Sequence, residues 1–201
     1  MKEKSKVEQV AEHVAGLIPL YTAEGDSTEV LLENGRSFID RRGIRSVLSA
    51  LARIHSLDLS AQRGQLQQQL NHRGVVPFYL APNRVFAAFK MRAAISGNDM
   101  VYGFIDRNYI NRLSPPDKNS FFLILKNGRQ IPITSSYATA AKNLDHAHNI
   151  HKLLVEPRAT RPPTPEELHN AAGVLALALI SDVHYIKQQL EQLTQPSPKQ
   201  E

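Results

Sequence analysis

The residues of this chain best suited to binding chemistry are arginines, and they concentrate in its middle. Residues 36–112 carry twelve Lys and Arg against four Asp and Glu, a net charge of +8, and Lys90 is the one lysine among the twelve. Residues 1–35 carry a net charge of −4 and residues 156–201 one of −2. Arginine presents a rigid fork of donors that fits phosphate and the edge of guanine. The distribution predicts a polyanionic partner, although ordinary solvated arginines would give the same count.

The candidate contacts to nucleic acid come from this zone and from the basic residues just beyond it. In a protein–DNA interface some of these contacts position the duplex and others read bases, and the sequence does not separate the two roles. The candidates are Arg41, Arg42, Arg45, Arg53, Arg84, Lys90, Arg92, Arg107, Arg112, Lys126 and Arg129.

Three histidines, His146, His148 and His151, have the residue type of a metal cluster. On a helix, spacings of two and five residues point the rings to different faces, whereas paired ligands are three or four residues apart. His148 and His151 have a suitable spacing, but only Asp145 offers a nearby carboxylate. We therefore expect solvated histidines, with neither a metal nor another cofactor.

Catalytic residues form no recognisable set in this sequence. It contains no G-x-S-x-G motif, no phosphate-binding P-loop and no G-x-G-x-x-G motif. Its central aspartates, Asp40, Asp58, Asp99 and Asp106, are scattered among arginines, where ion pairs are expected rather than acid–base catalysis. We expect that the protein is not an enzyme.

Aromatic residues fall in strand-like segments and have two possible roles. They could stack on single-stranded nucleic acid or pack in a hydrophobic core. Alternation places Tyr102 and Phe104 on the same face of one strand, which favours the core. The residues concerned are Phe78, Tyr79, Phe86, Phe89, Tyr102, Phe104 and Tyr109.

The elements that must position these side chains are short strands and helices. Residues 121–134 contain two β-rich runs around Asn127-Gly128, which predicts a type I′ hairpin in which both central residues have positive φ. Helix-spaced apolar residues predict a helix at 43–59 with outward-facing arginines. Asn34-Gly35 predicts another turn. Further strands are expected at 17–21, 28–32, 75–80, 84–92, 100–106 and 108–113, and further helices at 4–16, 60–70 and 136–154.

A proline-rich stretch over residues 157–165 predicts a linker between a domain over residues 1–156 and a C-terminal segment over residues 166–201. Thr164 suits a helix N-cap and Pro165 the first helical position, so a helix is expected after the linker. Its apolar positions repeat every seven residues. The helix could fold back on its own sheet or join a second copy, and we expect a homo-oligomer.

Composition narrows the class of protein. The chain has no cysteine, which excludes disulfides and suits a reducing cytoplasm. The longest apolar run, residues 171–180, is too short to cross a bilayer, and no apolar segment of a signal peptide follows the charged N-terminus. We expect a cytoplasmic protein without a membrane partner.

Three pieces of the sequence support a family resemblance. They are Ser37–Arg53, Val76–Phe89 followed by Val101–Ile105, and Leu125–Tyr137 with the helix after it. In this order they resemble the competence transcription factor (ComK) family of Gram-positive bacteria, over roughly residues 15–155. The resemblance implies a regulator that binds AT-rich promoter boxes as a multimer and activates transcription.

The C-terminal half of the same region also resembles a LytTR-type DNA-binding domain. In such domains an Arg-x-Tyr-Ile-x-Asn-like strand precedes an Asn-Gly hairpin, a proline and a serine. The matching residues are Arg107, Tyr109, Ile110, Asn111, Asn127, Gly128, Pro132 and Ser135. This resemblance also implies a β-rich module that binds promoter DNA.

The sequence thus predicts an α+β fold, with a mostly antiparallel sheet flanked by helices and a C-terminal amphipathic helix. The expected function is sequence-specific binding of double-stranded DNA in transcriptional regulation. The alternative is an adaptor module that binds an acidic partner protein. A convex basic strip would favour DNA, whereas dispersal or ion pairing of the same residues would favour the adaptor. The strip would consist of Arg84, Lys90, Arg92, Arg107 and Arg129.

Overall fold

The computed structural model describes residues 6–97, 99–117, 120–155 and Lys187. The chain divides into two units, Met1–Glu156 and Pro157–Glu201. The linker and C-terminal helix predicted for the second unit lie outside the described residues, apart from Lys187. The described part of the first unit has the predicted α+β fold, with two antiparallel sheets and three α-helices. No helix of the described residues is long and apolar enough to cross a membrane.

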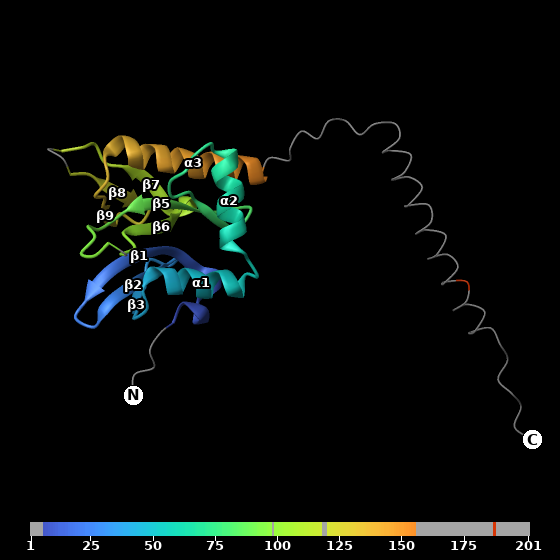
Figure 1. Ribbon diagram of the computed structural model, residues 1–201, viewed down its shortest axis with the longest axis horizontal. Coiled ribbons are helices and arrows are strands. Elements are labelled where there is room, and N and C mark those ends of the chain that lie inside the picture. Colours follow the sequence, from blue (N-terminus) through green and yellow to red (C-terminus); the bar gives the residue numbers. More distant parts are fainter. Residues whose placement is uncertain (1–5, 98, 118–119, 156–186, 188–201) are drawn as a thin grey trace, which may run out of the picture. The chain divides into compact units, whose positions relative to one another are not determined.

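Six antiparallel strands form the central sheet, in the order β3-β2-β1-β6-β5-β4 (Figure 1). The long β1–β2 hairpin is joined to the rest of the sheet where Gly16 and Leu17 of β1 pair with Ile105 and Phe104 of β6. Gly16 fits this crossing because a side chain there would meet Ile105. The strands are β1 (Val14–Thr22), β2 (Gly25–Leu32), β3 (Ser37–Asp40), β4 (Phe78–Ala81), β5 (Arg84–Lys90) and β6 (Tyr102–Asp106).

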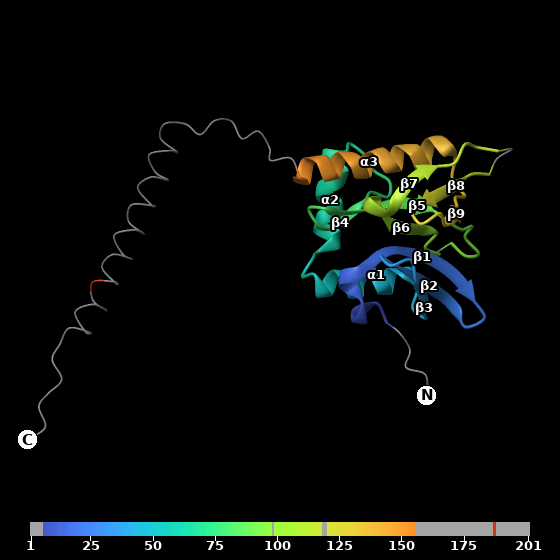
Figure 2. The ribbon, with the colours of Figure 1, turned by 180° about the vertical axis from the view of Figure 1, so that it is seen from behind.

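A second sheet and a long helix cover one face of the central sheet. The second sheet has the order β7-β8-β9, with β7 (Ile110–Leu113), β8 (Phe122–Leu125) and β9 (Gln130–Pro132). The helix α3 (Tyr137–Val155) packs against β5 (Figure 2). In α3 the buried Asn143 donates to the carbonyl of Ala88 at 2.9 Å.

Two hydrophobic cores lie on opposite faces of the central sheet. In β5, Val85, Ala87 and Phe89 join one core, while Phe86 and Ala88 join the other. A strand that is apolar on both faces is typical of a sheet covered on both sides. The first core includes α3 and the second sheet, and the second core includes α1 (Ile44–Ile54).

The helices α1 and α2 (Leu59–Gln69) are joined by residues 55–58 and run in clearly different directions (Figure 1). As its apolar spacing predicts, α1 buries Ile44, Val47 and Leu51. Asp58 is the N-cap of α2, and its carboxylate accepts the N–H groups of the first turn at 2.8 and 3.0 Å.

Gln62 fixes α2 to the central sheet. Its side-chain amide donates to the carbonyl of Tyr79 and accepts from the N–H of Tyr79, both at 3.0 Å. Tyr79 lies in β4, the last strand of the sheet, whose outer backbone groups would otherwise have no strand partner. The buried amide of Gln62 therefore acts as a short substitute for a neighbouring strand and covers this edge.

The helix predicted at residues 4–16 is wrong. Residues 7–9 and 11–13 form two separate 3₁₀ turns, and β1 begins at Val14. Val14 pairs with Leu32 in β2, and the N–H of Val7 donates to the buried carboxylate of Asp40 at 3.1 Å. The apolar spacing reflects burial of Val7, Ala11 and Val14 in the second core rather than a continuous helix.

The Asn127-Gly128 hairpin exists, but its predicted turn type is wrong. Gly128 has a φ of +83°, whereas Asn127 is not among the described residues with positive φ. The N–H of Gly128 donates to the carbonyl of Leu125, and the Asn127 side chain accepts from the N–H of Arg129 at 3.0 Å. These features fit a type I turn followed by a left-handed glycine. The Asn34-Gly35 turn has the same bonds, with a φ of +81° at Gly35.

Candidate nucleic-acid interface

The N-terminal acidic segment forms ion pairs with arginines from other parts of the first unit. Of its described carboxylates, all except that of Glu12 form ion pairs with arginines. The pairs are Glu8–Arg42 at 2.6 Å, Glu24–Arg41 at 2.6 Å, Asp26–Arg92 at 2.5 Å, Glu29–Arg129 at 2.8 Å and Glu33–Arg84 at 3.8 Å. Four of these arginines belong to the twelve basic residues of 36–112, and Arg129 lies beyond that zone, so the acidic segment pairs with a third of the central basic residues.

Arg84 connects three parts of the first unit. Its guanidinium donates to the carbonyls of Glu12, at 2.7 Å, and of Val14, and it lies 3.5 Å from the carboxylate of Asp106. It also lies over the ring of Phe86. Burial raises the pKa of Asp106, while the N–H of the neighbouring residue 108 and Arg84 act in the opposite direction. With 14% of its side chain exposed, Arg84 is a structural residue.

Arg92 is buried, unlike a phosphate contact on an open surface. Its guanidinium donates to Asp26 at 2.5 Å and to the carbonyl of Met100 at 3.0 Å. The guanidinium carbon also lies 3.8 Å from the centre of the Tyr21 ring. These contacts join β2, the segment before β6 and the end of β1.

Arg129 joins the two sheets through a bidentate ion pair. Its two terminal nitrogens lie 2.9 and 2.8 Å from the carboxylate oxygens of Glu29 in β2. Burial alone would raise the pKa of Glu29, but the hydrogen bonds from Arg129 and Ser37 outweigh it and hold the pKa below its ordinary value. The pair thus anchors the Asn127-Gly128 hairpin to the central sheet.

Arg42 holds two carboxylates at once. It bonds the buried Asp40 and the exposed Glu8. For Asp40, burial raises the pKa, but the bonds from Arg42 and from the N–H of Val7 leave the pKa below its ordinary value. The bond from Arg42 is the main reason why the pKa of Glu8 is lowered. The helix pattern predicts that Arg42 faces outward, but these two carboxylates hold its guanidinium.

The basic strip expected from the sequence does not form as a free surface. Arg84, Arg92 and Arg129 are all engaged with carboxylates, and Lys90 is half-buried on β5. Arg107 is half-buried beside α3. Burial lowers the pKa of His148 and of His151, and the positive charge of Arg107 lowers both pKa values further. Ion pairing of Arg84, Arg92 and Arg129 is the arrangement expected for the adaptor alternative.

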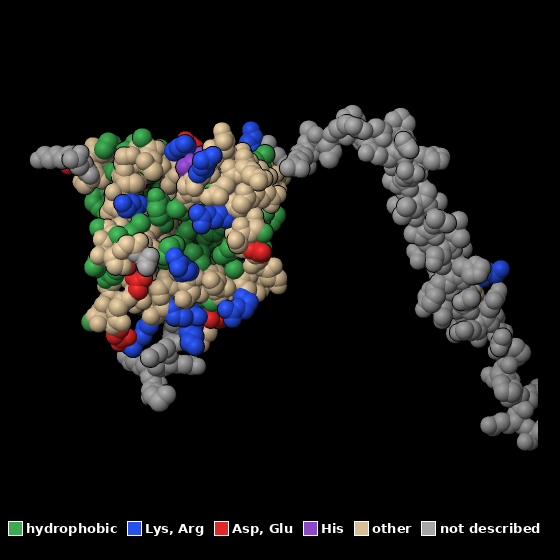
Figure 3. Space-filling view, viewed as in Figure 1, with side chains coloured by type: hydrophobic (Ala, Val, Ile, Leu, Met, Phe, Trp, Pro, Cys, Tyr) green, Lys and Arg blue, Asp and Glu red, His purple; other side chains and the backbone are tan. Residues whose placement is uncertain are grey.

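Several arginines have no carboxylate partner among the described residues, and four of them lie on α1, on α2 or just after α2. They are Arg45 and Arg53 on α1, Arg63 on α2, and Arg73, and all four are exposed. We call the surface formed by these four residues the α1–α2 face. Figure 3 looks onto α1 and α2 and shows Lys and Arg side chains around a hydrophobic hollow. Arg63 and Arg73 are absent from the sequence-based candidates, although the polar, Gln-rich helix that precedes Arg73 could have indicated them.

The exposed side of α2 combines small residues with glutamines. Ala61, Gly64, Gln65 and Gln68 are exposed and have the spacing of one helix face. Small residues let a helix approach a partner closely, and glutamine can form two hydrogen bonds with adenine. Two other basic candidates, Arg112 on β7 and Lys126 in the hairpin turn, are exposed and have no carboxylate partner in the described ranges.

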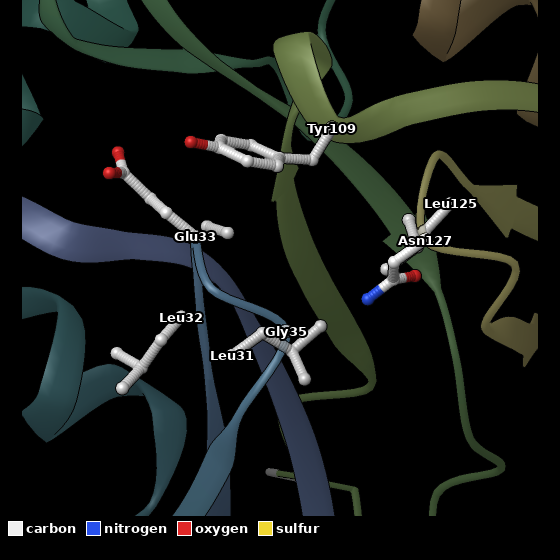
Figure 4. A pocket seen from close by; sticks show the side chains of 8 residues that line it. Leu31, Leu32, Glu33, Gly35, Tyr109, Leu125 and Asn127 are labelled. Atoms are coloured by element: carbon white, nitrogen blue, oxygen red, sulfur yellow. The ribbon is translucent and has the colours of Figure 1, made fainter.

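The two Asn-Gly turns meet over a small cavity, shown in Figure 4. A side chain on Gly35 would lie 3.4 Å from the Asn127 amide, and the cavity below holds about 40 Å³. The Tyr109 hydroxyl lies near the Glu33 carboxylate in this view. Burial raises the pKa of Tyr109, and the negative charge of Glu33 raises it further. A space of this size admits roughly two water molecules, which argues against a substrate pocket.

The remaining sequence expectations concern histidines and aromatic rings. The expectation of a solvated histidine is wrong for His146, which is buried with its ring centre 5.1 Å from that of His72, whereas His148 is exposed. No group of three or more potential ligands in the described ranges could hold a metal. Phe78 stacks on Phe86 at 4.8 Å and packs edge-on against Phe104. Core packing is therefore confirmed for these phenylalanines.

Comparison of the chain with models of protein families, with curated proteins and with solved structures found no match.

Proposed function

We propose that this protein binds double-stranded DNA through the α1–α2 face and acts as a sequence-specific transcriptional regulator in the cytoplasm. One observation carries the proposal. The carboxylates of the acidic segment pair with arginines elsewhere, and the arginines of the α1–α2 face keep their charge available to a partner. Between residues 43 and 73, Asp58 is the only acidic residue, and its carboxylate caps α2.

The arrangement of the two helices supports this function. Two helices joined by a turn of three or four residues form the unit with which many DNA-binding proteins place their second helix in the major groove. An α-helix with its side chains, about 10–12 Å wide, fits that groove. In this model of binding α2 enters the groove, and Arg45, Arg53 and Arg73 contact phosphates on either side.

Base reading would come from the exposed side of α2. Gln65 and Gln68 can each bond an adenine edge, and Arg63 can bond guanine or phosphate. Ala61 and Gly64 leave room for the helix to approach the bases. DNA-binding proteins of this kind commonly dimerise on paired half-sites, so we also propose a homo-oligomer as the binding species.

A salt titration tests the proposal. Binding of a labelled duplex, followed by fluorescence anisotropy, should weaken with salt with a log–log slope of about −0.9 per phosphate contacted. Arg45→Gln and Arg63→Gln should each weaken binding and make the slope smaller by about one. The matched control is Arg112→Gln, on β7 of the second sheet (Figure 2), which should leave both quantities unchanged. The absence of binding at low salt would refute the proposal.

A second experiment separates base reading from charge. Selection of bound sequences from a random duplex pool should yield a preferred site. Gln65→Ala and Gln68→Ala should then reduce the preference for that site while binding to unrelated DNA stays the same, because neither change removes a charge. An unchanged preference in both variants would move base reading away from α2.

The adaptor alternative is kept because the ion pairs of Arg84, Arg92 and Arg129 favour it. An acidic protein segment could use the same four free arginines. The salt titration distinguishes the two functions, since an adaptor would show no measurable affinity for duplex DNA at low salt.

A further inference from the structure

A groove between α1 and α2 has the size and lining of a ligand site. It encloses about 350 Å³, within the range of small-molecule pockets. Leu48, Leu59, Val75, Met100 and Phe104 supply its apolar lining. The hydrophobic hollow visible between the two helices in Figure 3 lies in this region.

The apolar lining is incompletely covered by the protein itself. Leu48, Leu59, Val75 and Met100 are only half-buried at the edge of the second core. Burial of apolar surface is favourable by roughly 25 cal/mol per Å², so an alkyl chain that covered these side chains would be held there. A purely polar ligand, such as inorganic phosphate, would leave them exposed to water.

The rim of the groove is cationic and polar. Arg45 from α1 and Arg63 from α2 line it, together with Ser49 and Ser60. Neither arginine has a carboxylate partner among the described residues. The Arg45 guanidinium has only a long contact with the sulfur of Met100, at 3.7 Å. Asp58, the acid nearest to Arg63 in sequence, does not line the groove, and its carboxylate accepts the first N–H groups of α2.

We propose that this groove binds a small amphipathic carboxylate, a molecule with one carboxylate head and an alkyl tail. The tail lies on Leu48, Leu59 and Phe104, and the head accepts hydrogen bonds from Arg45 and Arg63. Arginine and carboxylate form short, charge-assisted and frequently bidentate bonds, which explains why the head group is an anion. The single pair of arginines at the rim suits one charge better than a polyanion.

Ligand binding has a consequence for the α1–α2 face. A carboxylate head on Arg45 and Arg63 occupies two of its four free arginines, so the ligand should compete with DNA. This consequence depends on the proposed function, whereas ligand binding itself does not. The two ideas can therefore fail separately.

Isothermal titration calorimetry of the full chain tests the site with three probes. Decanoate, below its micellar concentration, should bind saturably at one site. Decanol, which lacks the charge, and acetate, which lacks the tail, should each bind at least about tenfold more weakly. Equal affinity for decanol and decanoate would overturn the role of the arginines, and equal affinity for acetate would overturn that of the lining. Saturable binding of an acidic amphipathic peptide without binding of decanoate would overturn the proposal in favour of a protein partner.

Variants place the site on the groove. Ser49→Phe should fill it and reduce decanoate affinity by about tenfold or more, whereas Ser46→Phe, on the exposed side of the same helix, should not. Arg63→Ala should also reduce the affinity, and Arg53→Ala, outside the groove lining, should leave it unchanged. Circular dichroism and thermal unfolding verify that each variant is folded. Equal losses in Ser49→Phe and Ser46→Phe, with both folded, would exclude the groove as the site.

Discussion

Replacement of Gln62 by alanine should weaken the attachment of α2 to the central sheet more than replacement of any exposed residue of that helix. Gln62 is 7% exposed, and its amide makes two 3.0 Å hydrogen bonds with the backbone of Tyr79. Alanine removes both bonds and leaves the N–H and the carbonyl of β4 facing a helix that cannot bond them. The helix itself is not weakened, because alanine is the better helix former by a few tenths of a kcal/mol.

The two lost bonds set the magnitude of the effect. A typical net contribution is about 0.5–1.5 kcal/mol for each bond, and a buried backbone group left unpaired costs about 1–3 kcal/mol. Tyr79 is half-buried, so water reaches part of this edge and reduces the penalty. We expect the free energy of unfolding to fall by about 2–3 kcal/mol, a substantial part of the 5–15 kcal/mol that holds a typical domain folded.

Urea unfolding followed by circular dichroism measures this loss. The matched control is Gln65→Ala, which makes the same chemical change on the exposed side of the same helix and should stay within about 0.5 kcal/mol of the parent protein. The difference between the two variants cancels the helix propensity of alanine. A Gln62→Ala variant as stable as Gln65→Ala would refute the inference that the amide holds α2 on β4.

Three further substitutions should change stability through contacts seen in the structure. Gly128→Val should lower the free energy of unfolding by about 1 kcal/mol or more, measured by thermal unfolding, because valine is strained at a φ of +83°. Glu29→Gln should destabilise the protein because it leaves the Arg129 guanidinium without its anion, and Glu24→Gln, in the exposed pair with Arg41, should change little in the same urea assay. Bonds from Arg42 lower the pKa values of Asp40 and Glu8. The stability that these two carboxylates contribute is therefore present above their ordinary pKa values of about 4 and is lost as the pH falls through their lowered pKa values. Arg42→Gln should make the free energy of unfolding depend less on pH in this acid range, measured by unfolding curves at a series of pH values.

Local signals in the sequence were sufficient for most elements of the fold. Glycine after asparagine marked both tight turns, since each turn needs one residue with positive φ. The spacing of Ile44, Val47 and Leu51 gave the buried face of α1. The turn type at residue 127 and the N-terminal 3₁₀ turns were not predictable, because they depend on bonds to distant strands. Val7, for example, is held by Asp40, 33 positions along the chain.

The binding surface was harder to predict for the same reason. Counting charges along the chain treats each arginine as free, but an arginine is free only if no carboxylate reaches it in the fold. Arg129 is 100 positions from Glu29 and Arg92 is 66 positions from Asp26, so no local pattern shows that either is paired. The sequence-based candidates therefore include structural arginines such as Arg92 and Arg129 and omit Arg63 and Arg73.

The ion pairs also make the remaining charge more informative than the total. A net charge of +5 spread over 201 residues would be weak evidence for any partner. After Glu8, Glu24, Asp26, Glu29 and Glu33 have paired with arginines, the exposed positive charge includes four arginines on or just after two consecutive helices. Positive charges that no carboxylate neutralises repel one another and do not stabilise the fold. The persistence of such charge on the α1–α2 face, beside an apolar groove, is the observation on which both proposed anionic partners rest, and the salt titration and the decanoate titration test them independently.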